Sequence, residues 1–119
     1  MLKQIIFNKF IIISFGSIIG ALLRWQIDDI FIGNILGCFI LGFINKLYLN
    51  PKLKLLIGFS FCGSLTTFSS WISDLFILLQ NSFYIGFFSN IFSFLIAGYI
   101  SLYLGYISGK KSNELIRFK

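Results

Sequence analysis

The chain has 119 residues, of which 57% are hydrophobic, 19% aromatic and 12% charged, with a mean hydropathy of +0.90. Soluble domains carry about 25% charged residues, so this composition excludes a soluble globular protein. A bilayer core about 30 Å thick takes about 20 helical residues per crossing, so the length accommodates about four crossings of one small all-α integral membrane protein. A unit of this size is too short to enclose an aqueous pore alone, and we expect it to oligomerise.

Uncharged runs locate four transmembrane helices, which we place near residues 5–27, 29–48, 54–80 and 83–108 of a single subunit spanning 1–119. The last two helices share an uncharged run that is too long for one crossing, and the polar sequence Gln80-Asn81-Ser82 divides it. The first apolar stretch lacks a convincing small-residue cleavage site, so we expect the first helix to be retained rather than removed as a signal peptide.

The basic residues are distributed unevenly. If the N-terminus is cytoplasmic, nine of the ten lie on the inner side and Arg24 alone lies on the outer side. The positive-inside rule then predicts a multi-pass protein of the prokaryotic plasma or inner membrane with both termini in the cytoplasm. Lipid headgroups beside the basic ends account for the net charge of +6, and we expect no nucleic-acid partner. The inner set is Lys3, Lys9, Lys46, Lys52, Lys54, Lys110, Lys111, Arg117 and Lys119.

Few residues are available for catalysis or metal binding. Histidine is absent and only four acidic residues are present, which argues against a catalytic dyad, a zinc site and a membrane carboxylate pair. Cys38 and Cys62 lie in apolar surroundings without a C-x-x-C motif, which favours small core residues over a disulfide or a metal ligand. We therefore expect a protein that is not an enzyme.

Glycines recur four residues apart in three of the predicted helices. Such G-x-x-x-G spacing allows two helix backbones to approach closely in a membrane. The spacing alone does not distinguish simple packing within the chain from a functional contact. The pairs are Gly16 with Gly20, Gly33 with Gly37, and Gly105 with Gly109.

The segment from Gly63 to Trp71 concentrates glycine, threonine and serine inside the third helix, where their helix propensity is poor. Unwound backbone at membrane depth persists only where protein buries it or where it lines a cavity. Carbonyls freed at Gly63 and Thr66 suit a hard cation such as Na⁺. An intact helix, with its hydroxyls bonded to carbonyls one turn earlier, explains the composition equally well.

Three motifs occur in order along the first three helices: GSIIGALLRW at 16–25, NILGCFILG at 34–42 and GFSFCGSLTTFS at 58–69. Together they resemble the fluoride channel family called Fluc or CrcB, which the fourth helix matches only loosely. The resemblance implies four-helix subunits that pair antiparallel in a dual-topology-type dimer, with the third helix broken at mid-membrane. It also implies a structural sodium ion that is not transported, held at the breaks by main-chain oxygens that match Gly63 and Thr66.

The resemblance further implies two fluoride paths at the dimer interface, each passing Asn34 and the ring of Phe68. Trp71 stands where the family has a second phenylalanine, and its indole would either strengthen contact with fluoride or obstruct the path. A selective path replaces the water around fluoride with amide and hydroxyl donors and with the positive edges of aromatic rings. Ser89 and Ser93 best match the family's polar track in the fourth helix, although serines often bond to their own helix backbone.

Arg24 matches an arginine of the family that follows Gly-Ala. It would either draw anions toward a vestibule or extend its charged end to the membrane interface and pair with Asp28 or Asp29. We favour the structural role.

The charge bias has a consequence for the dimer. A homodimer of two opposite orientations requires nearly balanced Lys and Arg across the membrane, and nine against one does not allow this. We hypothesise that the chain pairs with an oppositely biased homologue, with the homodimer as the alternative. The departures from the family pattern at Ile30, Ser64 and Trp71 agree, because a dedicated subunit can let one pore decay.

The sequence thus predicts a passive fluoride channel subunit that exports fluoride from the cytoplasm and lowers its toxicity. Two alternatives have a different chemistry. A small multidrug-type transporter needs a membrane carboxylate in its first helix, and none precedes Arg24 here. A nonconducting accessory membrane subunit does not account for the TTFS sequence in the third helix.

Overall fold

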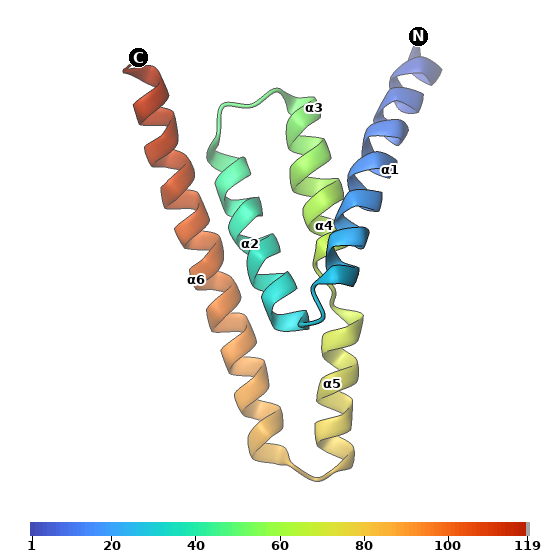
Figure 1. Cartoon of the computed structure of the whole chain (residues 1–119), viewed down its shortest axis with the longest axis vertical. Helices are drawn as coiled ribbons and strands as arrows, with labels where there is room; N and C mark the ends of the chain where they lie inside the picture. Colours follow the sequence, from blue (N-terminus) through green and yellow to red (C-terminus); the bar gives the residue numbers. More distant parts are fainter. Residues whose placement is uncertain (119) are drawn as a thin grey trace.

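The computed structural model describes residues 1–118, which form helices and connections without a β-strand (Figure 1). The predicted all-α class is confirmed. Lys119, one of the predicted inner basic residues, lies outside the described residues. The elements are α1 (Leu2–Gln26), α2 (Ile30–Lys46), α3 (Pro51–Lys54), the π-helical η1 (Leu55–Phe61), α4 (Cys62–Leu65), α5 (Ser69–Gln80) and α6 (Tyr84–Arg117).

Three helices are long and apolar enough to cross a membrane: Leu2–Gln26, the composite helix Pro51–Gln80 and Tyr84–Arg117. The composite helix joins α3, η1, α4 and α5 and is interrupted after α4. α2 is apolar but has 17 residues, a length of about 26 Å at 1.5 Å per residue. This is somewhat shorter than a bilayer core of about 30 Å, so the fourth crossing stays a prediction.

Local capping sets two of the helix starts. Asp29 caps α2, because its Oδ1 accepts a hydrogen bond from the Ile32 N–H at 3.0 Å. Asn50 caps α3 in the same way, accepting from the Lys52 N–H at 3.0 Å, and Pro51 occupies the first turn, where its missing N–H has no cost.

α1 packs against the composite helix through the first glycine pair. A Cβ on Gly16 would lie 2.7 Å from the Leu56 carbonyl oxygen, and one on Gly20 would collide with Phe61 O and Ser64 Oγ. Real side chains do not tolerate such separations, so both positions require glycine. The predicted close approach is confirmed for this pair.

α2 packs against α6 through glycines on both helices. A Cβ on Gly105 would collide with the Phe39 carbonyl oxygen, and one on Gly109 with the Phe43 carbonyl oxygen. Gly42 of α2 lies equally close to the backbone of α6. The close approach predicted for the third pair is therefore confirmed, and Gly42 adds to it.

Near the chain termini, Asn113 joins α6 to the end of α2. Its Nδ2 donates to the Lys46 carbonyl, and its Oδ1 accepts from the Tyr48 N–H at 3.2 Å. α6 therefore continues to Arg117 instead of ending near residue 108, where the apolar pattern stops. In Figure 1 this end of α2 lies on the same side of the molecule as both termini.

The packed interior is small. The buried apolar side chains are Ile44, Cys62, Leu65 and Leu75, whereas most large apolar side chains are exposed. An apolar exterior of this extent requires lipid or another protein subunit to cover it. The fold is thus that of a membrane protein with a thin internal core.

Candidate functional site

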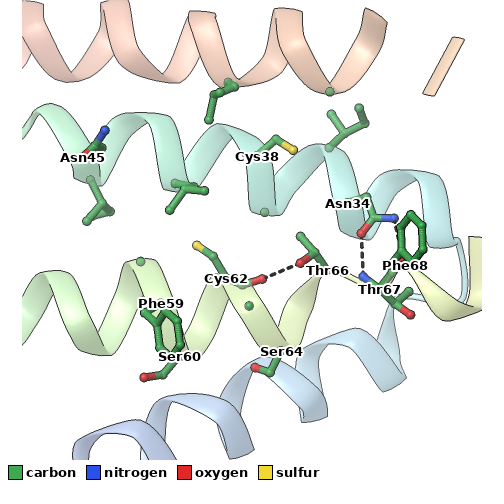
Figure 2. A pocket seen from close by; sticks show the side chains of 18 of the residues that line it. Asn34, Cys38, Asn45, Phe59, Ser60, Cys62, Ser64, Thr66, Thr67 and Phe68 are labelled. Carbon is green, nitrogen blue, oxygen red and sulfur yellow. Dashed lines mark hydrogen bonds between the residues drawn. The ribbon is translucent and has the colours of Figure 1, made fainter. Parts of the chain in front are cut away.

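Asn34 of α2 fixes the break in the composite helix (Figure 2). Its Nδ2 donates to the Thr67 carbonyl at 3.0 Å, and its Oδ1 accepts from the Thr67 N–H at 2.7 Å. The side chain is only 9% exposed, so both polar ends of the amide are satisfied inside the protein. α2 therefore holds the main chain at the point where the helical ladder is interrupted.

This clamp releases the Gly63 carbonyl. In a continuous α-helix the Thr67 N–H would bond to the carbonyl four residues earlier, which is that of Gly63. The Thr67 N–H instead donates to Asn34. The Gly63 carbonyl thereby loses its usual helical donor.

The Thr66 carbonyl is released by a second local bond. Its usual donor would be the Ser70 N–H, which is directed at Thr67 Oγ1 at 3.5 Å. Thr66 itself is extended, with φ −82° and ψ 151°, and its hydroxyl donates back to the Cys62 carbonyl at 3.0 Å. The structure thus has the predicted break, and the alternative's back-bonded hydroxyl also occurs on the turn just before it.

The main-chain oxygens freed at the break are of the chemical type that binds a hard cation. The released carbonyls at Gly63 and Thr66 are ligands of the kind that alkali and alkaline-earth cations prefer. Within residues 1–118, no group of three or more acidic or cysteine side chains is placed to hold a metal ion. A Cβ on Gly63 would meet nothing within 4 Å, so contacts within the chain do not explain this glycine.

A cavity of about 1050 Å³ brings together five of the predicted site residues. Figure 2 shows its wall at the break, where Asn34, Thr66 and Phe68 lie near one another. The Phe68 side chain is 71% exposed, as are many rings of this chain, so its surface is available to an ion, a partner or lipid. The five residues are Asn34, Gly63, Thr66, Phe68 and Trp71.

Trp71 is held by a partner that the sequence analysis did not identify. Its indole Nε1–H donates to Asn90 Oδ1 of α6 at 2.8 Å. Its ring stacks on Phe94 with centroids 4.9 Å apart and meets the Phe68 ring edge-on at 5.6 Å. The signal available in the sequence was an amide at position 90 within an apolar helix.

A second cavity of about 280 Å³ lies beyond Trp71. It includes Ser93 and Asn90 of α6, and Trp71 and Phe94 line it as well as the first cavity. Ser93 donates to the Asn90 carbonyl at 3.1 Å, so its hydroxyl follows the alternative of bonding to its own helix. Three acidic residues also line this cavity: Asp28, Asp29 and Asp74.

Two predicted residues lie away from the cavities. Ser89 is exposed on α6 and lines neither the 1050 Å³ nor the 280 Å³ cavity. Arg24 is exposed in the last turn of α1 and also lines neither. The roles predicted for both residues stay predictions.

The chain matches one protein family and is similar in sequence to several known proteins. Residues 11–106 match the family described as "CrcB-like protein, Camphor Resistance (CrcB)". The chain is 48% identical over 106 residues to "Fluoride-specific ion channel FluC 1" of Prochlorococcus marinus (strain NATL2A), covering 89% of this chain and 93% of the relative. It is 37% identical over 115 residues to "Fluoride-specific ion channel FluC" of Methanococcus aeolicus, covering 84% and 94%.

Proposed function

The chain belongs to the CrcB family of fluoride-specific ion channels, and we propose that it is one subunit of a passive channel that carries fluoride out of the cytoplasm. The family consists of membrane channels and not enzymes, in agreement with the scarcity of catalytic side chains. The proposal is supported by the Asn34 clamp on the broken helix and by the cavity that Asn34 lines together with Gly63, Thr66 and Phe68.

In this proposal Asn34 binds fluoride as well as the main chain of Thr67. An amide NH₂ has two hydrogens, and the Thr67 carbonyl takes one of them. The other is assigned to fluoride as it passes the break. The Phe68 ring lies on the wall of the same cavity, and its positive edge supplies a second favourable contact for an anion.

Sodium at the break is proposed as a structural ion. The carbonyls of Gly63 and Thr66 each lose their helical donor, and an unpaired carbonyl inside a membrane costs several kcal/mol unless a partner satisfies it. A cation held by these oxygens compensates that cost. Two subunits meeting at the open face of Gly63 would supply two such sets of carbonyls to one ion.

The assembly proposed is an antiparallel dimer in the cell membrane, with two paths along its interface and both termini of this chain in the cytoplasm. The exposed apolar exterior supports a partner, and the basic residues gathered near the termini support one fixed orientation. A chain fixed in one orientation pairs antiparallel only with an oppositely oriented subunit. We assign that place to a homologue with the reverse charge bias.

The direction of transport follows from the membrane potential. An inside-negative potential favours outward movement of an anion by about 2.3 kcal/mol per 100 mV. A passive path then lowers cytoplasmic fluoride without an energy source, which protects the cell.

Growth of bacteria that lack their own fluoride channel tests the proposal. Cells expressing this chain together with the oppositely biased homologue should grow at fluoride concentrations that arrest cells carrying an empty vector. Cells expressing this chain alone should gain little. Absence of protection by the pair, with both proteins present in the membrane, would contradict the proposed function, whereas full protection by this chain alone would contradict only the mixed dimer.

A further inference from the structure

The two cavities meet at an aromatic wall. Trp71 and Phe94 are the two residues that line both the 1050 Å³ cavity at the break and the 280 Å³ cavity beyond it. The boundary between the two cavities within this chain therefore includes these two rings. The width of any passage across this boundary depends on whether the Trp71 indole can move.

Contacts on several sides hold the indole. Its N–H is bound to Asn90 Oδ1 at 2.8 Å, and one face of the ring is covered by Phe94, with ring planes 20° apart. Phe68 lies edge-on to it, and Phe31 lies edge-on to Phe94 at 5.3 Å. Turning the indole aside would break the hydrogen bond and separate the stacked rings.

The one N–H donor of the wall is already bound within the chain. The N–H is the strongest donor of the indole, and Asn90 already occupies it. Beyond the wall, the carboxylates of Asp28, Asp29 and Asp74 line the smaller cavity and oppose an anion by charge.

We propose that Trp71, held in place by Asn90, closes the passage between the two cavities to fluoride. The inference rests on the proposed function and sharpens it: an assembled channel conducts along a route that avoids this indole, on the side of the partner subunit. Trp71 is then the residue that makes this chain's own route nonconducting, and Asn90 is a positioning residue that acts through Trp71.

Fluoride efflux from loaded vesicles tests the proposal, measured with an electrode at equal amounts of purified protein. Reconstitution from detergent inserts chains in both orientations, so two copies of this chain can meet without the native partner. Trp71→Phe removes the fused ring and the N–H, and should release fluoride at least about tenfold faster than the unmodified chain. Trp25→Phe is the matched control, because Trp25 is 81% exposed at the end of α1 and should leave efflux unchanged.

Two further variants test Asn90. Asn90→Ala should raise efflux in the unmodified chain but should add nothing to Trp71→Phe, because its effect passes through the indole. In the Trp25→Phe background Trp71 is the single tryptophan, and Asn90→Ala should shift its fluorescence emission through loss of the hydrogen bond. Unchanged emission, or an additive effect of the two substitutions, would overturn the positioning role.

The outcomes separate this inference from the proposed function. Efflux from the folded Trp71→Phe chain that is no faster than from the unmodified chain overturns the closed passage. If both release fluoride at the same measurable rate, the proposed function stands without the barrier. If no variant releases fluoride, alone or with the oppositely biased homologue, both proposals are overturned.

Discussion

Asn34 and Thr67 lie 33 positions apart in the chain, and the amide of the first bonds to both the N–H and the carbonyl of the second. The N–H bond is the reason that the Gly63 carbonyl has no helical donor, since Thr67 would otherwise provide it. One buried side chain thus decides both the path of the backbone and the chemistry that the backbone presents.

Asn34→Asp, added to the Trp71→Phe chain in which this chain's route is open, should suppress fluoride conduction and destabilise the protein. A carboxylate keeps the acceptor for the Thr67 N–H but cannot donate to the Thr67 carbonyl, and it places negative charge beside an anion path. Loss of one buried hydrogen bond should lower the free energy of unfolding by about 1–3 kcal/mol. Thermal unfolding and vesicle efflux measure the two effects. Asn81→Asp makes the same change at an exposed turn and should alter neither. Efflux from the Trp71→Phe chain that stays unchanged when Asn34→Asp is added would remove Asn34 from the path.

Sodium should stabilise the assembled protein. A cation that binds only the folded state stabilises it by about 2.7 kcal/mol at 100 times its dissociation constant. Replacing Na⁺ with N-methylglucamine during purification should therefore lower the melting temperature, and adding Na⁺ back should restore it. Melting temperatures that do not depend on the cation would argue against a sodium ion at Gly63 and Thr66.

Gly105→Ala should separate α2 from α6. The added Cβ would collide with the Phe39 carbonyl oxygen, so the two backbones must move apart, at a cost of about 1–3 kcal/mol. Gly98→Ala on the same helix is the matched control, because its Cβ would lie 3.8 Å from Cys38 Sγ, an ordinary contact. Equal melting temperatures for the two variants would show that the close approach at Gly105 is not needed.

The chain should insert in one orientation. A reporter fused to the C-terminus is expected to label from the cytoplasmic side only, because nine of ten basic residues favour that side. Adding lysines in the α5–α6 turn, at Gln80, Asn81 and Ser82, should produce a mixed population. Labelling of the unmodified chain from both sides in equal amounts would instead support a dual-topology homodimer.

The helices were predictable from the sequence where long apolar runs alternate with polar interruptions. The break in the third helix was predicted from residue types that disfavour helix. The structure places the break at residues 66–68, beside the carbonyls of Gly63 and Thr66. The end of α6 was wrong by several residues, because the lysines at 110 and 111 end the apolar run but not the helix. Asn113, which anchors this extension to α2, contributes through a tertiary contact that no local pattern reveals.

Five of the predicted site residues line one cavity, whereas Ser89 lines neither cavity and Ser93 lines only the second; their roles stay predictions, and their hydrogen bonds were not predicted. The motifs indicated Asn34, Phe68 and Trp71, and all three line one cavity. The Asn34 amide bonds to Thr67, and the Trp71 N–H donates to Asn90. Both hydrogen bonds depend on how α2, α5 and α6 pack against one another. Hydrogen bonds between helices depend on rotation and register, which a single sequence does not specify.

Fluoride efflux from vesicles that hold this chain together with the oppositely biased homologue tests the central claim most directly. We expect rapid release of fluoride from these vesicles and much slower release from vesicles that hold this chain alone. Retention of fluoride by the mixed vesicles, with both proteins folded and inserted, would contradict it.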